Sequence, residues 1–349
     1  MPSALLERPP VTAPQPEALD RPEMSTDVLV IGAGPTGLAC AIEVQNAGYS
    51  ARVIDKGCLV NSIYNYPTNM VFFTTPELLE IGGIPFPSAQ QKPTRQEALE
   101  YYRRVAQHFA LDVRQYLEVK KVSGKDGDFE ISACTRNGQV QTYRAKKVIV
   151  STGYYDLANL LNVPGESLPK VFHYYREPFP FFNSDVLIIG GKNSAAEVAL
   201  DLWRHGARVT LVHRGPQMHP HVKYWVRPDI ENRIQNDEIN AYFNSHVREI
   251  TENAAILETP QGPIRLNNDF VFALVGYHPD FDFLRSIGIE LSSEQCRPLC
   301  DPATLETNVP GIYVAGVIVA GSRTNEIFIE NGRFHGRLIA SDLQRKLGR

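Results

Sequence analysis

The sequence predicts an α/β protein in which two domains, each built on a parallel sheet, share one chain. Two observations predict this fold class. A unit of strand, glycine-rich turn, helix and second strand occurs twice, and each copy opens with an unbroken apolar strand, the kind that is buried on both faces of a parallel sheet. Gly32 and Gly190 are 158 residues apart, and so are Asp55 and His213, so the two copies are in register.

The first copy follows an N-terminal stretch that is rich in proline. We expect residues 1–24 to form a disordered extension, because this composition does not favour a packed core. The unit itself should contain a strand at 27–31, a turn at 32–37, a helix at 38–47 and a second strand that ends on Asp55.

One helix and several strands should separate the two copies. The helix is expected at 95–109, with Thr94 as its N-cap. Strands are expected at 118–122, 129–135, 141–144 and 147–153.

The second copy should contain a strand at 185–189, a turn at 190–195, a helix at 196–203 and a strand at 208–212. We expect the chain to continue with strands at 255–258, 270–275 and 312–316 and to close with a helix at 325–344. The second unit interrupts the first, so the chain should cross between domains near 155–175 and 276–285. Residues 25–160 and 279–349 would then form one domain, and residues 161–278 the inserted one.

The glycines of the first turn have distinct purposes. Gly32 permits a tight turn, Gly34 lets the backbone approach a pyrophosphate, and Gly37 lets the helix pack closely on the strand. The helix N-terminus then offers free N–H groups to phosphate oxygens. In the second copy Lys192 replaces the middle glycine and Ala195 the last one, and the lysine either adds favourable charge or obstructs the backbone.

The ends of the two second strands distinguish the ligands. Asp55 can accept hydrogen bonds from the free ribose hydroxyls of an adenosine group. The matching position holds His213, followed by Arg214, whose guanidinium suits a 2′-phosphate. The sequence therefore predicts FAD at the first turn and NADPH at the second, within two Rossmann-like dinucleotide-binding domains, the NAD(P)H domain being inserted into the FAD domain.

Composition excludes several other classes. The net charge of −4 and the pI near 6.2 give no reason to expect nucleic acid or an anionic membrane as partner. No apolar run reaches the roughly 18 to 20 residues of a membrane span, so we expect a cytoplasmic protein. The five cysteines are scattered and show no metal-ligand spacing, which predicts neither a disulfide framework nor a metal site.

From Asp27 onward the chain resembles the thioredoxin-reductase-like flavoproteins and, more narrowly, the bacillithiol disulfide reductase family. The resemblance rests on residues 70–78, 92–95, 190–195, 223–226, 228–233, 306–318 and 328–333 in addition to the first turn. It implies an NADPH-dependent FAD oxidoreductase that is a homodimer or homotetramer. A small-molecule disulfide or a redox protein would be its electron acceptor.

The motifs and the resemblance together give a set of expected cofactor-binding residues. The resemblance also implies that the segment 68–70 approaches the flavin ring. For FAD the residues are Gly32, Gly34, Pro35, Thr36, Gly37, Asp55, Lys56, Gly153, Gly316, Val317, Asn325 and Glu326. For NADPH they are Gly190, Gly191, Lys192, Asn193, Ser194, Ala195, His213 and Arg214.

The chain departs from these relatives in its sulfur chemistry. The Cys-x-x-Cys of thioredoxin reductases is absent from the comparable segment at 171–175, and Thr36 stands where the bacillithiol family has a cysteine. A hydroxyl cannot form a mixed disulfide. Val317 also replaces the aspartate that follows the glycine in thioredoxin reductases.

Two residues remain as catalytic candidates. Cys40 lies one helical turn after Thr36, near a helix N-terminus that could lower its pKa, although a buried core cysteine is the alternative. His173 lies where thioredoxin reductases place their cysteines and is a candidate proton donor. Three functions stay open: a disulfide reductase, an NADPH reductase of a carrier such as ferredoxin, and a non-enzymatic redox sensor.

Overall fold

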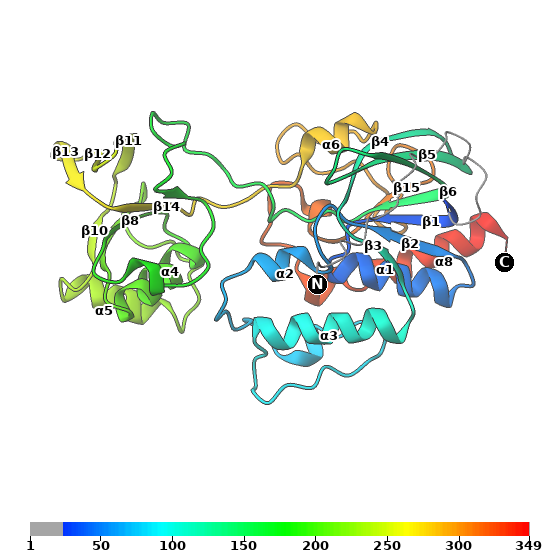
Figure 1. Ribbon diagram of the computed structural model, residues 1–349, viewed down its shortest axis with the longest axis horizontal. Helices are drawn as coiled ribbons and strands as arrows, with labels where there is room; N and C mark the ends of the chain where they lie inside the picture. Colours follow the sequence, from blue (N-terminus) through cyan, green and yellow to red (C-terminus); the bar gives the residue numbers. More distant parts are fainter. Residues whose placement is uncertain (1–23, 349) are drawn as a thin grey trace, which may run out of the picture.

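The computed structural model describes residues 24–348, so the predicted extension lies almost entirely outside the described residues. Two separate sheets organise these residues, and Figure 1 shows them in two lobes joined by two crossing segments. The chain ends of the described part both belong to the lobe of the larger sheet.

The larger sheet has seven strands in the order β3-β2-β1-β6-β5-β4, with β15 paired to the last residues of β6, beyond the part that pairs with β5. Its parallel part is the predicted nucleotide-binding unit, and β4 and β5 extend it in antiparallel fashion. The strands are β1 (Ser25–Ile31), β2 (Ala51–Ile54), β3 (Asp112–Arg114), β4 (Leu117–Lys125), β5 (Asp128–Thr135), β6 (Val140–Val150) and β15 (Ile312–Val314).

Helices pack against this sheet through their apolar residues. Val28, Val30 and Val53 of the sheet share one buried cluster with residues of α1 (Pro35–Asn46) and α8 (His335–Leu347). The remaining helical segments of this lobe are α2 (Asn61–Asn65), η2 (Pro76–Leu78), α3 (Arg95–His108), α6 (Phe281–Ser286), η4 (Gly316–Ala320) and α7 (Ile329–Gly332).

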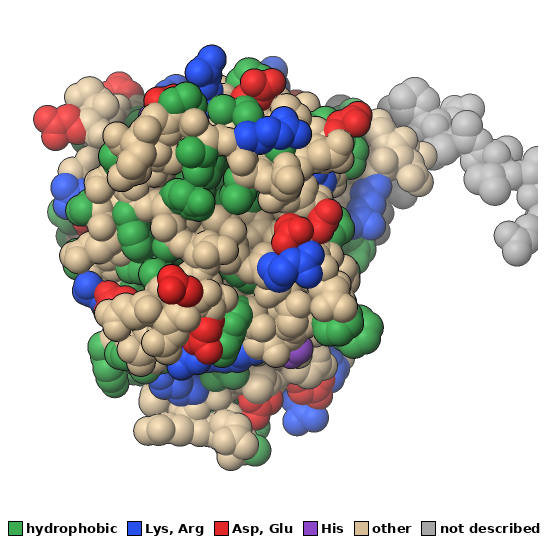
Figure 2. Space-filling view, turned by 90° about the vertical axis from the view of Figure 1, so that its left-hand side faces the viewer, with side chains coloured by type: hydrophobic (Ala, Val, Ile, Leu, Met, Phe, Trp, Pro, Cys, Tyr) green, Lys and Arg blue, Asp and Glu red, His purple; other side chains and the backbone are tan. Residues whose placement is uncertain are grey.

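The second lobe contains a parallel five-stranded sheet in the order β10-β9-β8-β14-β7 and a small antiparallel sheet, β11-β12-β13. Its strands are β7 (Val171–Phe172), β8 (Asp185–Ile189), β9 (Arg208–Val212), β10 (Asn240–Tyr242), β11 (His246–Ile250), β12 (Ala254–Thr259), β13 (Gly262–Asn267) and β14 (Phe270–Ala273). Its helical segments are η3 (Phe179–Phe181), α4 (Asn193–Arg204) and α5 (Arg227–Gln235). Figure 2, which views the molecule from this end, shows side chains of both charges interspersed with hydrophobic ones.

The two crossing segments pair with each other. Ala158 and Tyr277 form an antiparallel bridge, the amide of Asn159 donates to the carbonyl of Gly276 at 2.9 Å, and that of His278 donates to Leu157 at 3.0 Å. The connection between the lobes is therefore a two-stranded hinge at residues 157–159 and 276–278.

Two sequence expectations about elements are wrong. The strands expected at 141–144 and 147–153 are one strand, β6, which pairs with β5 along its first half and with β1 and β15 along its second. The closing helix does not begin at Asn325. The backbone of Phe328 is extended, the side chain of Asn331 accepts its amide hydrogen at 2.8 Å, and α7 and α8 follow as separate helices.

Candidate functional site

The first turn is packed so tightly that two of its glycines have no substitute. Gly32 has a φ of +110°, and a Cβ there would lie 2.5 Å from the carbonyl oxygen of Ser151. A Cβ on Gly37 would lie 1.9 Å from the carbonyl oxygen of Gly32. Ser151 was not predicted; its buried hydroxyl donates to the carbonyls of Ile31 and Gly32, both at 3.1 Å. The turn is therefore fixed against the end of β6.

Gly34, between them, faces open space. A Cβ there would meet nothing within 4 Å, and no side chain caps the helix that starts at Pro35. By contrast, α3 is closed by the predicted cap, since Thr94 and Glu97 form a reciprocal capping box. The backbone N–H groups at the start of α1 are thus left for a ligand, which is the arrangement that an anionic phosphate requires.

Asp55 fastens the turn to the end of β2. Its carboxylate accepts hydrogen bonds from the amides of Ala33 at 2.6 Å and Gly57 at 2.7 Å. Burial raises the pKa of Asp55, and the two backbone donors oppose that rise. The neighbouring Lys56 forms an ion pair with Asp156 at 3.1 Å. Gly153, with a φ of +72°, follows Ser151 where β6 has ended.

Thr36 lies where three distant segments meet. A Cβ added to Gly316 or to Gly332 would lie 3.2 Å from the Thr36 hydroxyl oxygen, so both backbones pass directly beside this side chain. The amide of Gly316 donates to Nδ1 of His335 at 3.0 Å, and burial lowers the pKa of that imidazole. His335 and Gly332 were not predicted as site residues, because they are far from the turn in the sequence and only the fold brings them to it.

The other residues expected beside the flavin are differently placed. Val317 lies in η4, half-buried, directly after Gly316. Asn325 and Glu326 are exposed in the turn before α7, and the Glu326 carboxylate pairs with Arg297 at 2.6 Å and Arg323 at 3.3 Å. The residue from this part of the chain that lies against Thr36 and Gly316 is Gly332 of α7, rather than Asn325 or Glu326.

The second turn repeats this construction with one difference. A Cβ on Gly190 would lie 2.5 Å from the Leu274 carbonyl oxygen and 3.0 Å from the Cβ of Ala195. A Cβ on Gly191 would lie 2.4 Å from Nδ1 of His213, so this imidazole stands against the turn where Asp55 stands in the first copy. Burial, together with Arg214 and His219, lowers the pKa of His213.

Lys192, the departure from the glycine pattern, is the N-cap residue of α4, and it points outward. Its backbone is extended, its side chain is exposed and no side-chain cap closes the helix. Ser194 is also exposed, whereas the side-chain Oδ1 of Asn193 accepts from the backbone amide of Lys223 at 2.9 Å. The lysine therefore leaves the uncapped N-terminus of α4 open.

Glu197, one turn into α4, is a further group that sequence reasoning missed. Burial raises its pKa to about 7, and the positive charge of Lys223 only partly opposes that rise. This carboxyl can change its protonation state near neutral pH. The recurring unit alone could not reveal this property, since Glu197 occupies an ordinary helix position in the sequence.

Cys40 contradicts the expectation of a lowered pKa. The residue is fully buried in the core between α1 and α8, and burial raises the pKa of its thiol to about 12. The backbone of Gly336 covers it, since a Cβ on that glycine would lie 2.9 Å from the Cα of Cys40. All five cysteines are free. Within residues 24–348, no cluster of His, Cys, Asp or Glu is arranged to hold a metal ion.

His173 lies at the junction of the lobes. Its Nε2 is 3.6 Å from a carboxylate oxygen of Glu166, and its carbonyl accepts from the Tyr277 hydroxyl at 3.1 Å. Its Nδ1 is buried and has no hydrogen-bond partner among the described residues. The junction is otherwise aromatic: ring centroids lie 4.8 Å apart for Tyr66 and Tyr155 and 4.7 Å apart for Tyr155 and Tyr277.

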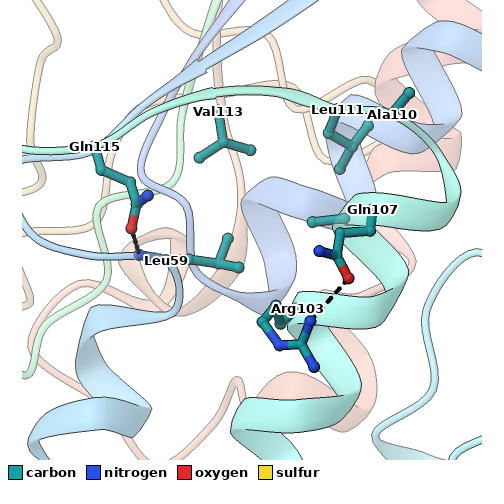
Figure 3. Close-up of a pocket in the computed structure, with 8 residues that line it drawn as sticks. Leu59, Arg103, Gln107, Ala110, Leu111, Val113 and Gln115 are labelled. Atoms are coloured by element: carbon teal, nitrogen blue, oxygen red, sulfur yellow. Dashed lines mark hydrogen bonds between the residues drawn. The ribbon is translucent and has the colours of Figure 1, made fainter.

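A cavity of about 300 Å³ opens between α3 and β3, and none of its lining residues was singled out by the sequence (Figure 3). Gln115 spans one side of it by accepting from the amide of Leu59 at 2.8 Å, and Arg103 donates to Gln107 at 2.9 Å on the other side. Its walls are mainly aliphatic, and we assign it no role. In the described part of the chain, no helix is both long and apolar enough to cross a membrane.

Comparisons with known proteins agree with this geometry. A family model for pyridine nucleotide-disulphide oxidoreductases matches residues 29–316. Bacilliredoxin reductase Bdr of Bacillus subtilis is 45% identical over 319 residues, which cover 91% of this chain and 97% of that protein. A solved structure of bacillithiol disulfide reductase Bdr from Bacillus cereus is 45% identical, with a TM-score of 0.90 over 92% of this chain and 99% of that one. Thioredoxin reductase of T. acidophilum, at 23% identity and a TM-score of 0.71 over 93% of this chain and all of that one, shares the fold.

Proposed function

Because the chain belongs to the pyridine nucleotide-disulphide oxidoreductase family, we propose that it transfers hydride from NADPH, held at the second turn, to FAD, held at the first, and then passes electrons to a disulfide. The family resemblance and the α/β fold expected from the sequence are confirmed, and the chain is an oxidoreductase. Its thioredoxin-reductase-like relatives are FAD- and NADPH-dependent flavoproteins.

The observation that carries the proposal is the pair of uncapped helix N-termini behind glycine turns. The open space at Gly34 fits a pyrophosphate, and the uncapped N-termini of α1 and α4 each follow directly on a glycine turn. Asp55, at the end of β2, would hold the ribose of FAD, while His213 and Arg214 would hold the 2′-phosphate of NADPH. When bound, the two groups supply the hydride chemistry.

The residues around Thr36 would position the flavin end of the site. His335 fixes the amide of Gly316, and the two glycine backbones beside Thr36 leave little room for side chains. Val317 offers no carboxylate, so a hydrogen bond that an aspartate would make there has to come from another group or is absent. The chain's residues thus bind and orient, and the redox centre belongs to the cofactor.

The acceptor is proposed from the relatives, whose names state bacilliredoxin and bacillithiol disulfide as their substrates. Cys40 is buried as a thiol, and Thr36 cannot form a mixed disulfide, so electrons would pass from the flavin to the acceptor without an enzyme disulfide. A carrier protein such as ferredoxin is the second candidate, because the same absence of a reactive thiol suits it equally well.

The decisive experiment is an anaerobic titration of the oxidised, FAD-loaded protein with NADPH. We expect the flavin to be bleached by about one equivalent per subunit. About two equivalents would reveal a second redox centre beside the flavin, and a pair of the chain's cysteines would then be the leading candidate for it. Reoxidation by bacillithiol disulfide, by oxidised bacilliredoxin or by ferredoxin would then identify the acceptor. A flavin that NADPH does not bleach would contradict the proposed hydride transfer and favour a non-enzymatic redox sensor.

A further inference from the structure

Aromatic and basic side chains gather at one place where the two lobes touch outside the hinge. Tyr224 and Trp225, in the loop before α5, are 81% and 40% exposed, and their ring centroids lie 4.8 Å apart. The Trp225 ring centroid lies 5.9 Å from that of Phe73, 3.7 Å from the Lys92 ammonium and 5.8 Å from the Lys223 ammonium. We call these five residues the tryptophan surface.

The two lysines of the tryptophan surface carry charge that acidic neighbours do not cancel. Neither ammonium forms an ion pair with a carboxylate among residues 24–348. Glu97, the acidic residue nearest to Lys92 along the chain, is held by the amides of Thr94 at 2.7 Å and Ala89 at 3.1 Å. Burial raises the pKa of Glu197, so it offsets only part of the charge of Lys223 at neutral pH. The surface is therefore positive on a chain whose net charge is −4.

The first-lobe side of the tryptophan surface is close to the expected flavin ring along the chain. Residues 68–70 are expected to approach that ring, and Phe73 follows three residues later. The segment is fixed beside the one that contains Lys92, because the amide of Phe72 donates to the carbonyl of Pro93 at 2.9 Å. A molecule docked on the surface would therefore lie next to the flavin end of the site.

We propose that the tryptophan surface is the docking site of a protein electron acceptor, a small redox protein whose disulfide is surrounded by acidic side chains. The inference rests on the proposed function, in which the reduced flavin passes electrons to a disulfide. Tyrosine and tryptophan contribute much of the binding energy in protein interfaces, and unpaired lysines select a partner of opposite charge. A small-molecule disulfide would cover only a fraction of a surface that spans both lobes.

The redox step that follows docking is balanced within the complex. The dihydroflavin gives up two electrons and two protons and becomes FAD, while the S–S bond of the partner breaks and its two sulfurs become thiols. No residue of the tryptophan surface takes part in this step, so its residues position the partner. Because both lobes contribute to the surface, it is complete only in the arrangement described here, which assigns it to the oxidative half-reaction.

The test follows the oxidative half-reaction of the FAD-loaded full chain, whose flavin is first reduced anaerobically with one equivalent of dithionite, so that NADPH binding does not enter. Oxidised bacilliredoxin is the protein acceptor, and bacillithiol disulfide is the small acceptor. Tyr224→Ala should slow reoxidation by bacilliredoxin about tenfold. Lys92→Gln should slow it about threefold at low ionic strength, and salt should remove this difference. Neither substitution should change reoxidation by bacillithiol disulfide.

Two matched variants serve as controls. Tyr224→Phe keeps the ring, and Lys121→Gln removes an exposed lysine of β4 in the first lobe, so both should behave like the wild-type protein. Unchanged bacilliredoxin rates in Tyr224→Ala and Lys92→Gln would overturn the inference, and so would equal losses with both acceptors. Wild-type protein that reacts with bacillithiol disulfide alone would overturn it as well. Failure of both acceptors to reoxidise the wild-type flavin would instead overturn the proposed function.

Discussion

At the residue scale, Gly34 and Gly37 differ in the space that is available where a side chain would begin. A methyl group on Gly37 would collide with the Gly32 carbonyl oxygen at 1.9 Å, whereas one on Gly34 would enter open space. Gly37→Ala should therefore destabilise the FAD lobe by several kcal/mol, as overpacking does. Gly34→Ala should fold normally but bind FAD at least tenfold more weakly, because the methyl group would occupy the space assigned to the pyrophosphate.

Thermal unfolding of the flavin-free proteins and flavin titration of each separate these effects. The wild-type protein and Gly48→Ala serve as controls. Gly48 follows the end of α1, and a Cβ there would meet no atom within 4 Å. Its φ of +86° should make that variant slightly less stable and leave its FAD affinity unchanged. Full FAD affinity in Gly34→Ala would show that the pyrophosphate does not bind at this turn.

Glu197 provides a second prediction at this scale. Its pKa rises from 4.5 to about 7 on folding, so the native state binds the extra proton between these values. Its contribution to stability is present below pH 4.5 and is lost as pH rises through 7. Glu197→Gln should consequently match the wild-type protein at pH 4.5 and exceed its free energy of unfolding by about 1–3 kcal/mol at pH 8. Urea unfolding of both proteins at both pH values measures this difference. A difference that is the same at both pH values would show that burial does not raise the pKa of Glu197.

At the scale of elements, local signals account for what the sequence could predict. The N-cap at Thr94 was readable because it depends on a local signal at the start of the helix, and so were the two glycine turns with their strands. The partner of Thr94 in the capping box, Glu97, was not predicted. The short strands β3 and β10 were missed, since each pairs with a strand that is far away in the sequence. β11 and β13 were missed too, although both pair with the adjacent β12. The meeting of Thr36, Gly316 and His335 was equally inaccessible, because it arises only when the ends of the chain fold together.

The capping box itself is testable. Thr94→Ala removes the acceptor of the Glu97 amide at the start of α3 and should lower the free energy of unfolding by about 1 kcal/mol. Thr94→Ser keeps the acceptor and should restore most of that loss. Chemical denaturation measures the free energy of unfolding of both variants. Equal values for Thr94→Ala and Thr94→Ser would mean that the packing of α3, and not its cap, determines how stable this helix is.

At the scale of the whole molecule, the hinge and a contact outside it decide how the lobes are held. Trp225, in the loop before α5, touches the first lobe: the Lys92 ammonium lies 3.7 Å from its ring centroid, and the Phe73 ring is 5.9 Å away. Because only two segments join the lobes, we expect the second lobe to rotate about them to bring NADPH to the flavin. Such a rotation would have to separate Trp225 from Lys92 and Phe73.

Trp225→Ala should therefore favour the rotated arrangement. A cation–π contact at an exposed site is worth about 0.5–1 kcal/mol, so the rate of flavin reduction by NADPH should rise about two- to fivefold if rotation limits it. Single-molecule distances between labels on the two lobes should shift in population by the same factor. Tyr224→Ala is the control, because Tyr224 is the more exposed neighbour, at 81%, and its ring packs against Trp225 within the same loop. Distances that stay constant through turnover in all three proteins would mean that the lobes transfer hydride without rotating.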